Sequence, residues 1–527
     1  MKLTGRAFLA APWARMAAVA TLVGAAAGWL VYGVQFRSIS TDDGISLMAA
    51  AAIRDQGLPL LPSGQLYNRA YLAHYVLALS TGIFGTGDVG ILLPSLVAGV
   101  GTLALVHEIG RRMLGSSGTG LLAAFLLACS SMQMAYSVSP RMYGLLTFFT
   151  TWATYAAWRG FGEGSRRHRI LALWVLALGL QCERGAGTLV AAVPLALFAI
   201  EPAPLRTRLT AIIRRHPIGV PEWSSALVLA GSMALAVFQP ANALRVVIGS
   251  GGNPPDFFEF SLSPTRFFWH LLHLDGMLTG TLGLALLGAI TAAGGAPGAR
   301  FLLVMLAVPF VQVALVMDQT GHRIVLFLLP LYALFVAFGL ASLVAAIRDR
   351  SLPPRLLIAT LLAGALQGGA VLVAAQRPKA MKAVYASGYL LPDQSRQGHP
   401  EIERELRWLR TQVADEDLVL TSNPWISDHY VGKTDGIIRQ HPNGARGFTT
   451  FPEPRDEYFG ALIYDQIEEL DTLLAGLARS QRVWIVLDTK ADVYCSSEFR
   501  AGVAARLTRV NKSRRVRIYA SAQPVPP

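Results

Sequence analysis

Charged residues are scarce in this sequence. Asp, Glu, Lys and Arg make up 15% of its 527 residues, whereas 53% are hydrophobic. Soluble domains contain about 25% charged and about 45–50% apolar residues, so a chain built only of soluble domains is excluded. The net charge of +13 does not indicate nucleic-acid binding, because the arginines lie mainly in short loops between apolar runs. The composition is that of an integral membrane protein.

Cysteines and nucleotide-binding motifs are also rare. Cys129, Cys182 and Cys495 form neither a disulfide framework nor a metal-ligand cluster, and no spacing pattern supports a bridge between Cys182 and Cys495. The sequence has no Walker-type phosphate loop, fixed-period repeat or low-complexity tract. No nucleotide site is therefore evident.

Apolar runs long enough to cross about 30 Å of hydrocarbon predict a polytopic protein with about eleven transmembrane helices. The run between residues 170 and 200 is broken only by Gln181, Cys182, Glu183 and Arg184, so ten or twelve helices remain possible. The predicted helices cover residues 16–36, 88–109, 118–135, 140–158, 169–182, 185–200, 224–240, 271–292, 300–317, 322–345 and 354–375.

The arginine distribution predicts the orientation. With the N-terminus in the cytoplasm, every short inner loop is basic, as the positive-inside rule requires. The first apolar segment is longer than a usual signal-peptide core, which favours an uncleaved anchor over a cleaved leader. The opposite side then holds the first outer loop, 37–87, the corner at 181–184, the loop 241–270, the segment 321–323 and the C-terminal part from residue 376.

The character of the chain changes near residue 376. Short β-rich runs (DLVLTS, DGIIRQ, RVWIVLD, RRVRIYA) alternate with helical stretches such as IEELDTLLAGLARS, which predicts a C-terminal soluble α/β domain. We therefore expect two domains, a mostly α transmembrane domain over 1–375 and an outer α/β domain over 376–527. An enzyme working on that face would find no nucleotide sugar, so its donor would arrive attached to a lipid.

Two adjacent acids, Asp42 and Asp43, follow the first apolar segment. The residues after them, 45–53, could form a short amphipathic helix on the membrane surface. Acids are favoured in the first turn of a helix, so a solvated capping pair competes with a catalytic pair as the interpretation.

Basic residues from separate segments are predicted on the same outer face. Guanidinium groups match phosphate oxygens, so such a cluster beside two carboxylates suits a phosphorylated lipid. A single arginine at a helix end could instead extend to lipid headgroups. The residues concerned are Arg69, Arg141, Arg184, His322 and Arg323.

The order of these features resembles the GT-C class of membrane glycosyltransferases that use polyprenyl-phosphate sugars. The similar branch holds protein O-mannosyltransferases and the lipid A aminoarabinose transferase. The similarity covers most of residues 30–345 in order, and TSNPWISDHYVGKTDGIIRQ is similar to the outer tails of some relatives. The stretches that carry it are the acidic pair, LYNRAYLAHYVLALSTGIFG, GILLPSLVAGVGTLALVHEIGRRMLG, YSVSPRMYGLLTFF, CERGAG and HRIVLFLLPLYALFVAFGL.

Several positions depart from the family pattern. The family often has Asp-Glu where this chain has Asp42-Asp43, and Thr-Lys where it has Glu183-Arg184. It often has Lys-Pro-Pro in place of the tripeptide 68–70, Arg-Tyr in place of the dipeptide 323–324, and an Arg in place of Leu93. Charge is largely kept, so the chemistry is plausible while the substrates can differ.

The resemblance implies an inverting glycosyltransferase. Asp42 would deprotonate the acceptor hydroxyl, and Asp43 would orient Asp42, bind the sugar or hold a divalent metal. Arg69, Arg184 and Arg323, with Arg141 and His322, would neutralise the departing lipid phosphate. Glu183 would pair with Arg184 or with the amino group of an amino sugar. Three tyrosines could stack on the sugar or line the groove, although interfacial aromatic residues commonly anchor helices: Tyr67, Tyr71 and Tyr143.

The implied partners are a polyprenyl-phosphate sugar, an acceptor lipid, glycan or protein, and the surrounding membrane lipids. The alanine- and arginine-rich composition suits a bacterial inner membrane protein whose active face is periplasmic. The sugar and the acceptor stay open.

Other classes of protein fit this sequence less well. A transporter of lipid-linked or small anionic substrates would show ionisable residues near the middle of the bilayer and matching broken helices in two halves, and neither is evident. A phosphoethanolamine transferase would need a metal-ligand set in the soluble domain, for which Asp428, His429, His441 and Asp488 are too scattered. An enzyme that joins O-antigen chains and a nonenzymatic scaffold are further alternatives.

Overall fold

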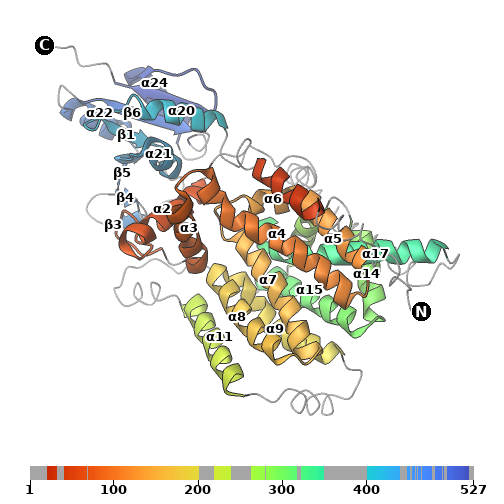
Figure 1. Cartoon of the computed structure of the whole chain (residues 1–527). Helices are drawn as coiled ribbons and strands as arrows, with labels where there is room; N and C mark the ends of the chain where they lie inside the picture. Colours follow the sequence, from red (N-terminus) through yellow and green to blue (C-terminus); the bar gives the residue numbers. More distant parts are fainter. Residues whose placement is uncertain are drawn as a thin grey trace. The chain divides into compact units, whose positions relative to one another are not determined.

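The computed structural model forms two compact units, which are described separately (Figure 1). The first comprises residues 1–32, 68–76 and 83–393, and the second comprises 33–67, 77–82 and 394–527. The described residues are 20–31, 39, 41–67, 69–200, 219–238, 263–278, 281–316, 322–348, 400–438, 448–450, 454–456, 459, 461–464, 466–477, 481–488, 491 and 495–521. The predicted helix 354–375, the boundary near residue 376 and His441 lie outside them.

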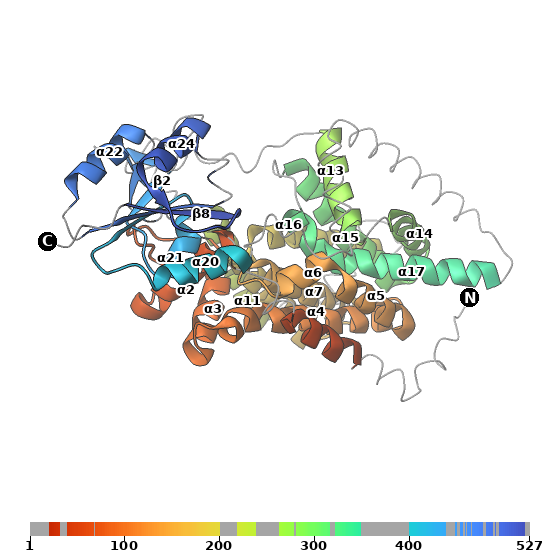
Figure 2. The same cartoon turned by 90° about the horizontal axis from the view of Figure 1, so that it is seen from above.

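The first unit is a helical bundle, seen in two views in Figures 1 and 2. Its first described helix covers Ala20–Val31, and the first turns of α3 (Tyr71–Phe84) also belong to it. The others are α4 (Asp88–Met113), α5 (Ser117–Cys129), α6 (Ser131–Ser137), α7 (Tyr143–Ala157), the π-helical turn η1 (Trp158–Gly162), α8 (Arg166–Cys182), the 3₁₀ turn η2 (Arg184–Gly187), α9 (Thr188–Ile200), α11 (Val220–Phe238), α13 (Pro264–Gly276), α14 (Leu282–Ala293), α15 (Pro297–Val316), α16 (His322–Val325), the 3₁₀ turn η3 (Leu326–Leu328) and α17 (Leu329–Arg348).

Most predicted apolar runs form helices, but two of them are broken. The run 118–135 divides into α5 and α6, which are bent by 73° at Ser130. The Ser130 hydroxyl donates to the Met277 carbonyl at 3.0 Å and accepts the Gln133 amide at 3.4 Å, so this residue starts a new helix. The run 271–292 divides into α13 and α14. The predicted interruption between 170 and 200 is confirmed, because α8 ends at Cys182 and Glu183 has an extended backbone.

Three described helices are long and apolar enough to cross a membrane, and a fourth span results if the bent pair α5 and α6 is counted as one. The chain is a multi-pass membrane protein, while the total of eleven spans stays a prediction. No disulfide joins Cys182 and Cys495.

The second unit contains an α/β domain with an eight-stranded sheet in the order β3-β4-β5-β2-β1-β6-β8-β7. Strand β1 pairs in parallel with β2 and β6, and β2 pairs in parallel with β5. The predicted α/β domain is thereby confirmed. Its elements are α20 (Pro400–Arg410), β1 (Leu418–Thr421), α21 (Pro424–Val431), β2 (Gly436–Ile438), β3 (Phe448–Thr450), β4 (Pro454–Asp456), β5 (Leu462–Tyr464), α22 (Ile467–Gly476), β6 (Val483–Asp488), α24 (Ser497–Arg506), β7 (Thr508–Arg509) and β8 (Val516–Ala520).

Each face of this sheet is covered by helices. Strand β6 (VWIVLD) is buried along its whole length, as expected for a central strand covered on both faces. On one face, Trp484 and Val486 pack with Leu406 of α20 and Ile426 of α21. On the other face, residues of α22 and α24 pack against the alternate strand residues.

The second unit also contains the acidic segment of the first outer loop. Helix α2 (Thr41–Gln56) carries both predicted acids, and it packs against α21. A small apolar cluster joins α2 to the part of α3 that belongs to this unit, with Ala50 and Ile53 against Leu77 and Ala78. The acids are thus built into the same compact unit as the α/β domain.

Candidate functional site

Asp42 and Asp43 occupy the first turn of α2. Negative charge is favoured there, because unsatisfied amide groups make the helix N-terminus electropositive. Asp42 is half-buried, whereas Asp43 is 0% exposed. The interpretation of a solvated pair is therefore wrong for Asp43, because tertiary packing covers its carboxylate. Asp42 is the member of the pair that a substrate can reach.

Helix α21 holds the acidic turn from both sides. Gly44 lies so close to α21 that an added Cβ would be 2.9 Å from the Trp425 Cβ and 3.0 Å from the Trp425 carbonyl oxygen. Before the acids, the Ile39 amide donates to the Tyr430 hydroxyl at 3.1 Å, and the Ile39 side chain packs against the domain core. The acidic turn is fixed to the C-terminal domain by residues on either side of it.

His429 of α21 interacts electrostatically with Asp43. Burial lowers the pKa of the His429 imidazole, and the charge of Arg407 lowers it further. The charges of Glu403 and Asp43 raise this pKa, but they do not outweigh burial. The sequence offers His429 only as one of several scattered possible metal ligands, and no local pattern predicts that it interacts with Asp43.

Three of the predicted basic residues gather in the first unit. Burial lowers the pKa of the Arg184 guanidinium, Glu183 raises it, and the nearby charge of Arg69 lowers it. The Glu183 carboxylate also accepts the Arg184 amide at 3.0 Å, so it caps the 3₁₀ turn η2. Arg69 is exposed and precedes α3, and the intervening Ala70 has a left-handed backbone with φ of 52°.

Arg141 and Arg69 both interact with His74, a buried residue that the sequence reasoning missed. Burial lowers the pKa of His74, the Arg141 charge lowers it further, and the Arg69 backbone raises it. The Arg141 guanidinium lies 5.6 Å from the centre of the Tyr143 ring, which packs edge-on against Tyr136 at 5.2 Å.

Arg323 lies on a neighbouring element. It is exposed in α16, while Phe327 of the following turn η3 faces Gly185 of η2, where an added Cβ would be 3.6 Å from the Phe327 ring. The turn that carries Arg184 therefore packs against the segment that follows Arg323. His322 begins α16, but its side chain lies outside the described part of the structure.

The remaining predicted tyrosines have different environments. Tyr71 begins α3 and is partly buried; burial and the neighbouring Tyr75 raise the pKa of its phenol. Tyr67 is partly buried in the second unit, and its amide donates to the Pro59 carbonyl at 2.8 Å. A part in binding sugar stays a prediction for Tyr67, Tyr71 and Tyr143.

The acidic pair does not fit a shared metal ion. Successive side chains of an α-helix point about 100° apart, so Asp42 and Asp43 diverge instead of converging on one ion. Among the residues that the structure describes, no group of three or more His, Cys, Asp or Glu side chains could hold a metal. We therefore assign no step to a metal held by this pair.

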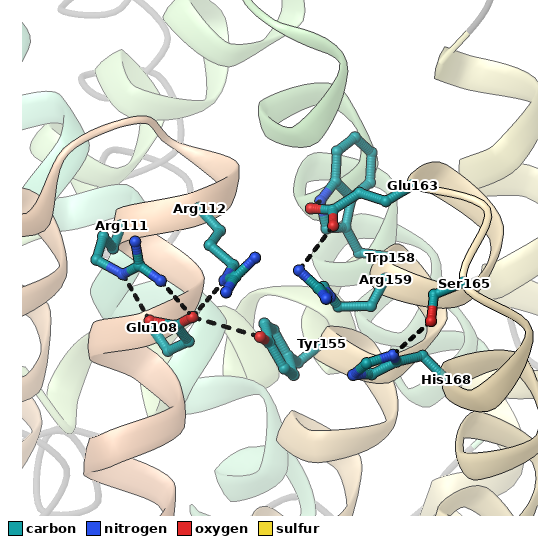
Figure 3. A network of polar contacts seen from close by, with 9 residues as sticks. All are labelled: Glu108, Arg111, Arg112, Tyr155, Trp158, Arg159, Glu163, Ser165 and His168. Carbon is teal, nitrogen blue, oxygen red and sulfur yellow. Dashed lines mark hydrogen bonds and ion pairs between the residues drawn. The ribbon is translucent and has the colours of Figure 1, made fainter.

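Figure 3 shows a second polar network, at the C-terminal end of α4. The Ser95 hydroxyl donates to the Ser139 carbonyl, which places the Arg141 segment near the N-terminal end of the same helix. At about 1.5 Å per residue, Ser95 and Glu108 are about 20 Å apart along α4. The network consists of Glu108, Arg111, Arg112, Tyr155, Trp158, Arg159, Glu163, Ser165 and His168.

Within this network a hydrogen bond joins α4 to α7, while the ion pairs lie within α4 and within the junction between α7 and α8. Glu108 accepts hydrogen bonds from Arg111 at 2.7 Å and from Tyr155 at 3.4 Å, and Arg159 pairs with Glu163 at 2.9 Å. Arg111, Arg112 and Arg159 are among the basic residues from which the inner loops are predicted. In the structure, each of them is paired with an acid. Such partly exposed pairs typically contribute below about 1 kcal/mol each, so their main effect is to fix the helix ends.

The helical bundle and the C-terminal α/β domain together form a fold that is shared with solved membrane-protein structures. The fold is similar to that of ArnT from Cupriavidus metallidurans bound to undecaprenyl phosphate, with a TM-score of 0.63 and 13% identity over 95% of this chain and 97% of that one. It is also similar to the Archaeoglobus fulgidus oligosaccharyltransferase, with a TM-score of 0.53 and 13% identity over 92% and 69% of the two chains.

Sequence comparison places the chain more narrowly. Residues 68–214 match the family described as dolichyl-phosphate-mannose-protein mannosyltransferase. This match lies within residues 30–345, where the sequence resembles the GT-C glycosyltransferases. A segment of 119 residues is 29% identical to the undecaprenyl phosphate-alpha-4-amino-4-deoxy-L-arabinose arabinosyl transferase of Pseudomonas aeruginosa. That segment covers 23% of this chain and 21% of its relative, so the chain matches about a fifth of the relative's length.

Proposed function

We propose that the chain is an inverting glycosyltransferase that moves a sugar from a polyprenyl-phosphate donor to a hydroxyl or phosphate group of an acceptor. We place it in a bacterial inner membrane, with its reaction on the periplasmic face. The family match and the fold shared with an undecaprenyl-phosphate-bound ArnT support this class of donor. The sugar and the acceptor are to be found by experiment.

The observation that carries the proposal is the group formed by Arg69, Arg141 and Arg184. The like charges of Arg69 and Arg184 disfavour each other, as the effect of Arg69 on the pKa of Arg184 shows. Arg141 acts in the same way on His74. Guanidinium groups that lie near one another can donate hydrogen bonds to a single anionic ligand. A lipid phosphate supplies oxygen atoms of the required geometry.

In the proposed reaction, the Asp42 carboxylate takes the proton from the acceptor hydroxyl. The acceptor oxygen then attacks the anomeric carbon from the face opposite the lipid phosphate, and the bond from that carbon to the phosphate oxygen breaks. Arg69 and Arg184, with Arg141 and Arg323, stabilise the negative charge on the leaving polyprenyl phosphate. Asp42 receives the role of base because its carboxylate is accessible, whereas Asp43 is buried.

The test incubates the purified full-length protein with a panel of radiolabelled polyprenyl-phosphate sugars and follows release of sugar from the lipid. We expect Asp42→Asn to lower turnover by about 10²- to 10⁴-fold, because a positioned general base typically contributes that much. Binding of polyprenyl phosphate should be retained. Arg184→Ala should instead weaken binding of the lipid phosphate.

Matched controls come from exposed residues of the same types. Asp415→Asn and Arg167→Ala change exposed side chains, and both variants should keep wild-type turnover and binding. If the wild type releases sugar from no donor in the panel, or if Asp42→Asn is fully active, the proposed reaction is wrong. Movement of an intact donor across vesicles without cleavage would support a transporter instead.

A further inference from the structure

One face of α21 is turned toward the acidic helix. Trp425 and His429 are four residues apart on α21, so they lie one above the other on the same side of this helix. Trp425 makes the close approach to Gly44, which places this side against the first turn of α2. The residue next to Gly44 is Asp43, the fully buried acid. His429 therefore lies on the helix face that covers this acid.

We propose that His429 is a positioning residue, which fixes the Asp43 carboxylate and, through the first turn of α2, the orientation of the neighbouring Asp42. The inference rests on the proposed function, in which Asp42 is the base. Asp43 and Asp42 are consecutive residues of one helical turn, so a shift of the buried side chain moves the accessible one. A displacement of about 1 Å at a reacting group can cost about 10²-fold in rate.

Three charged residues act on the His429 imidazole, in decreasing order Arg407, Glu403 and Asp43. Arg407 and Glu403 reach it from α20, but they pair with each other at 2.9 Å and so largely offset one another. On α21 itself, its ring is 4.8 Å from the Tyr430 ring, and Asp428 is adjacent in sequence. The Tyr430 hydroxyl is engaged with Glu403 at 3.3 Å and with the Ile39 amide. Asp43 is the charged group that reaches His429 from α2.

Burial explains why such a partner matters. A carboxylate removed from water is costly unless hydrogen bonds and opposite or dipolar charge compensate it. The N-terminus of α2 supplies part of this compensation, and an imidazole can supply a further N–H donor while neutral. Helix α2 packs on α21 within the second unit, so the inference gives the C-terminal domain a part in positioning the acids.

The experiment is a double-mutant cycle in the full-length protein, with His429→Ala, Asp43→Asn and the double variant. We expect His429→Ala to lower kcat by about 10-fold with the KM for the lipid donor unchanged, since positioning alters the reacting geometry. The double variant should be no slower than Asp43→Asn alone, because the two residues act as one unit. His429→Gln, which keeps a hydrogen-bonding amide, should recover part of kcat.

His168→Ala provides the matched control, because His168 belongs to the network at the C-terminal end of α4. This variant should keep the wild-type kcat. Wild-type kcat in His429→Ala, or effects of His429→Ala and Asp43→Asn that multiply in the double variant, would overturn the inference.

A second readout separates this inference from the proposed function. The same cycle is measured in the unfolding temperature, which requires no turnover. A double variant whose unfolding temperature matches that of the less stable single variant supports the pairing, and additive shifts refute it. An inactive wild type would refute the proposed function alone.

Discussion

Two adjacent acids in one helical turn have different environments. Asp42 is accessible, whereas Asp43 is enclosed by the packing of α2 on α21. The sequence TDDG predicts that the two acids lie at the start of a helix, because local preferences favour acids there. It could not predict which acid is buried, because that depends on Trp425 and Tyr430, which are almost 400 positions away in the chain.

Gly44 allows the close approach that encloses Asp43. We expect Gly44→Ala to destabilise the protein by about 1–3 kcal/mol, because the new methyl group would overpack the contact with Trp425. Turnover should fall as well, since α2 must move. Thermal unfolding and donor turnover measure the two effects.

The control is Gly231→Ala in α11, where an added Cβ has open space within 4 Å. Alanine favours a helix, so this variant should be unchanged or more stable. Equal stability of Gly44→Ala and the wild type would show that the contact with Trp425 is loose.

The lowered pKa of His429 predicts a pH effect on stability. In the unfolded chain this histidine takes up a proton near pH 6.5, but in the folded protein it does so only at lower pH. The unfolded state therefore binds more protons between these two values, so stability is lost as the pH falls below about 6.5. His429→Gln lacks this titration and should lose less stability.

The measurement compares unfolding temperatures of the wild type and His429→Gln from pH 7.5 to pH 5. Other titrating groups, such as Asp428, are common to both proteins and cancel in the difference. A wild type that is no more acid-sensitive than His429→Gln would contradict the assignment of the shift to this residue.

At the scale of elements, apolar runs predict the helices but not their breaks. The run 118–135 is continuous in hydropathy, yet Ser130 ends one helix and begins another through bonds to Met277 and Gln133. The first bond spans 147 positions, so no local pattern reveals it. The break at Glu183 was predictable, because polar residues interrupt the run there. Strands β1, β6 and β8 were predictable from their β-branched and aromatic runs.

The crossing of α14 and α17 depends on two glycines. An added Cβ at Gly288 would collide with the Phe335 carbonyl, and one at Gly339 would collide with the Leu284 carbonyl. Small residues allow such close backbone approach in membrane bundles. We expect Gly288→Ala and Gly339→Ala each to lower the unfolding temperature, and Gly339→Leu to lower it further.

Thermal unfolding in detergent, followed by the loss of monodisperse protein, measures this prediction. Gly24→Ala serves as the control, because an added Cβ there meets nothing within 4 Å. An unchanged unfolding temperature in both crossing variants would mean that the two helices can separate without cost.

At the scale of the whole molecule, composition predicts two kinds of structure but not the grouping of the chain. The change in composition near residue 376 separates an apolar part from an α/β part. Residues 33–67 nevertheless belong to the compact unit that contains the α/β domain. Contacts such as Ile39 with Tyr430 determine this grouping, and contacts so distant in sequence leave no compositional signal.

The orientation of the molecule in the membrane leads to the last prediction. The arginine-rich inner loops predict that Arg167 is cytoplasmic and that the C-terminal domain, with Lys512, is on the other side. Both side chains are exposed, so either position can carry a reactive thiol. In a background with Cys129→Ser, a membrane-impermeant maleimide should label Lys512→Cys in right-side-out vesicles and should label Arg167→Cys only after permeabilisation.

The two variants control for each other, because each should be labelled fully in detergent. The reversed pattern would place the acids and the C-terminal domain in the cytoplasm, where nucleotide sugars are available. The argument for a lipid-linked donor would then lose its topological basis, while the proposed phosphate-binding role of Arg69 and Arg184 does not depend on the side of the membrane. Labelling of Lys512→Cys alone supports a donor that reaches the outer face attached to a polyprenyl lipid.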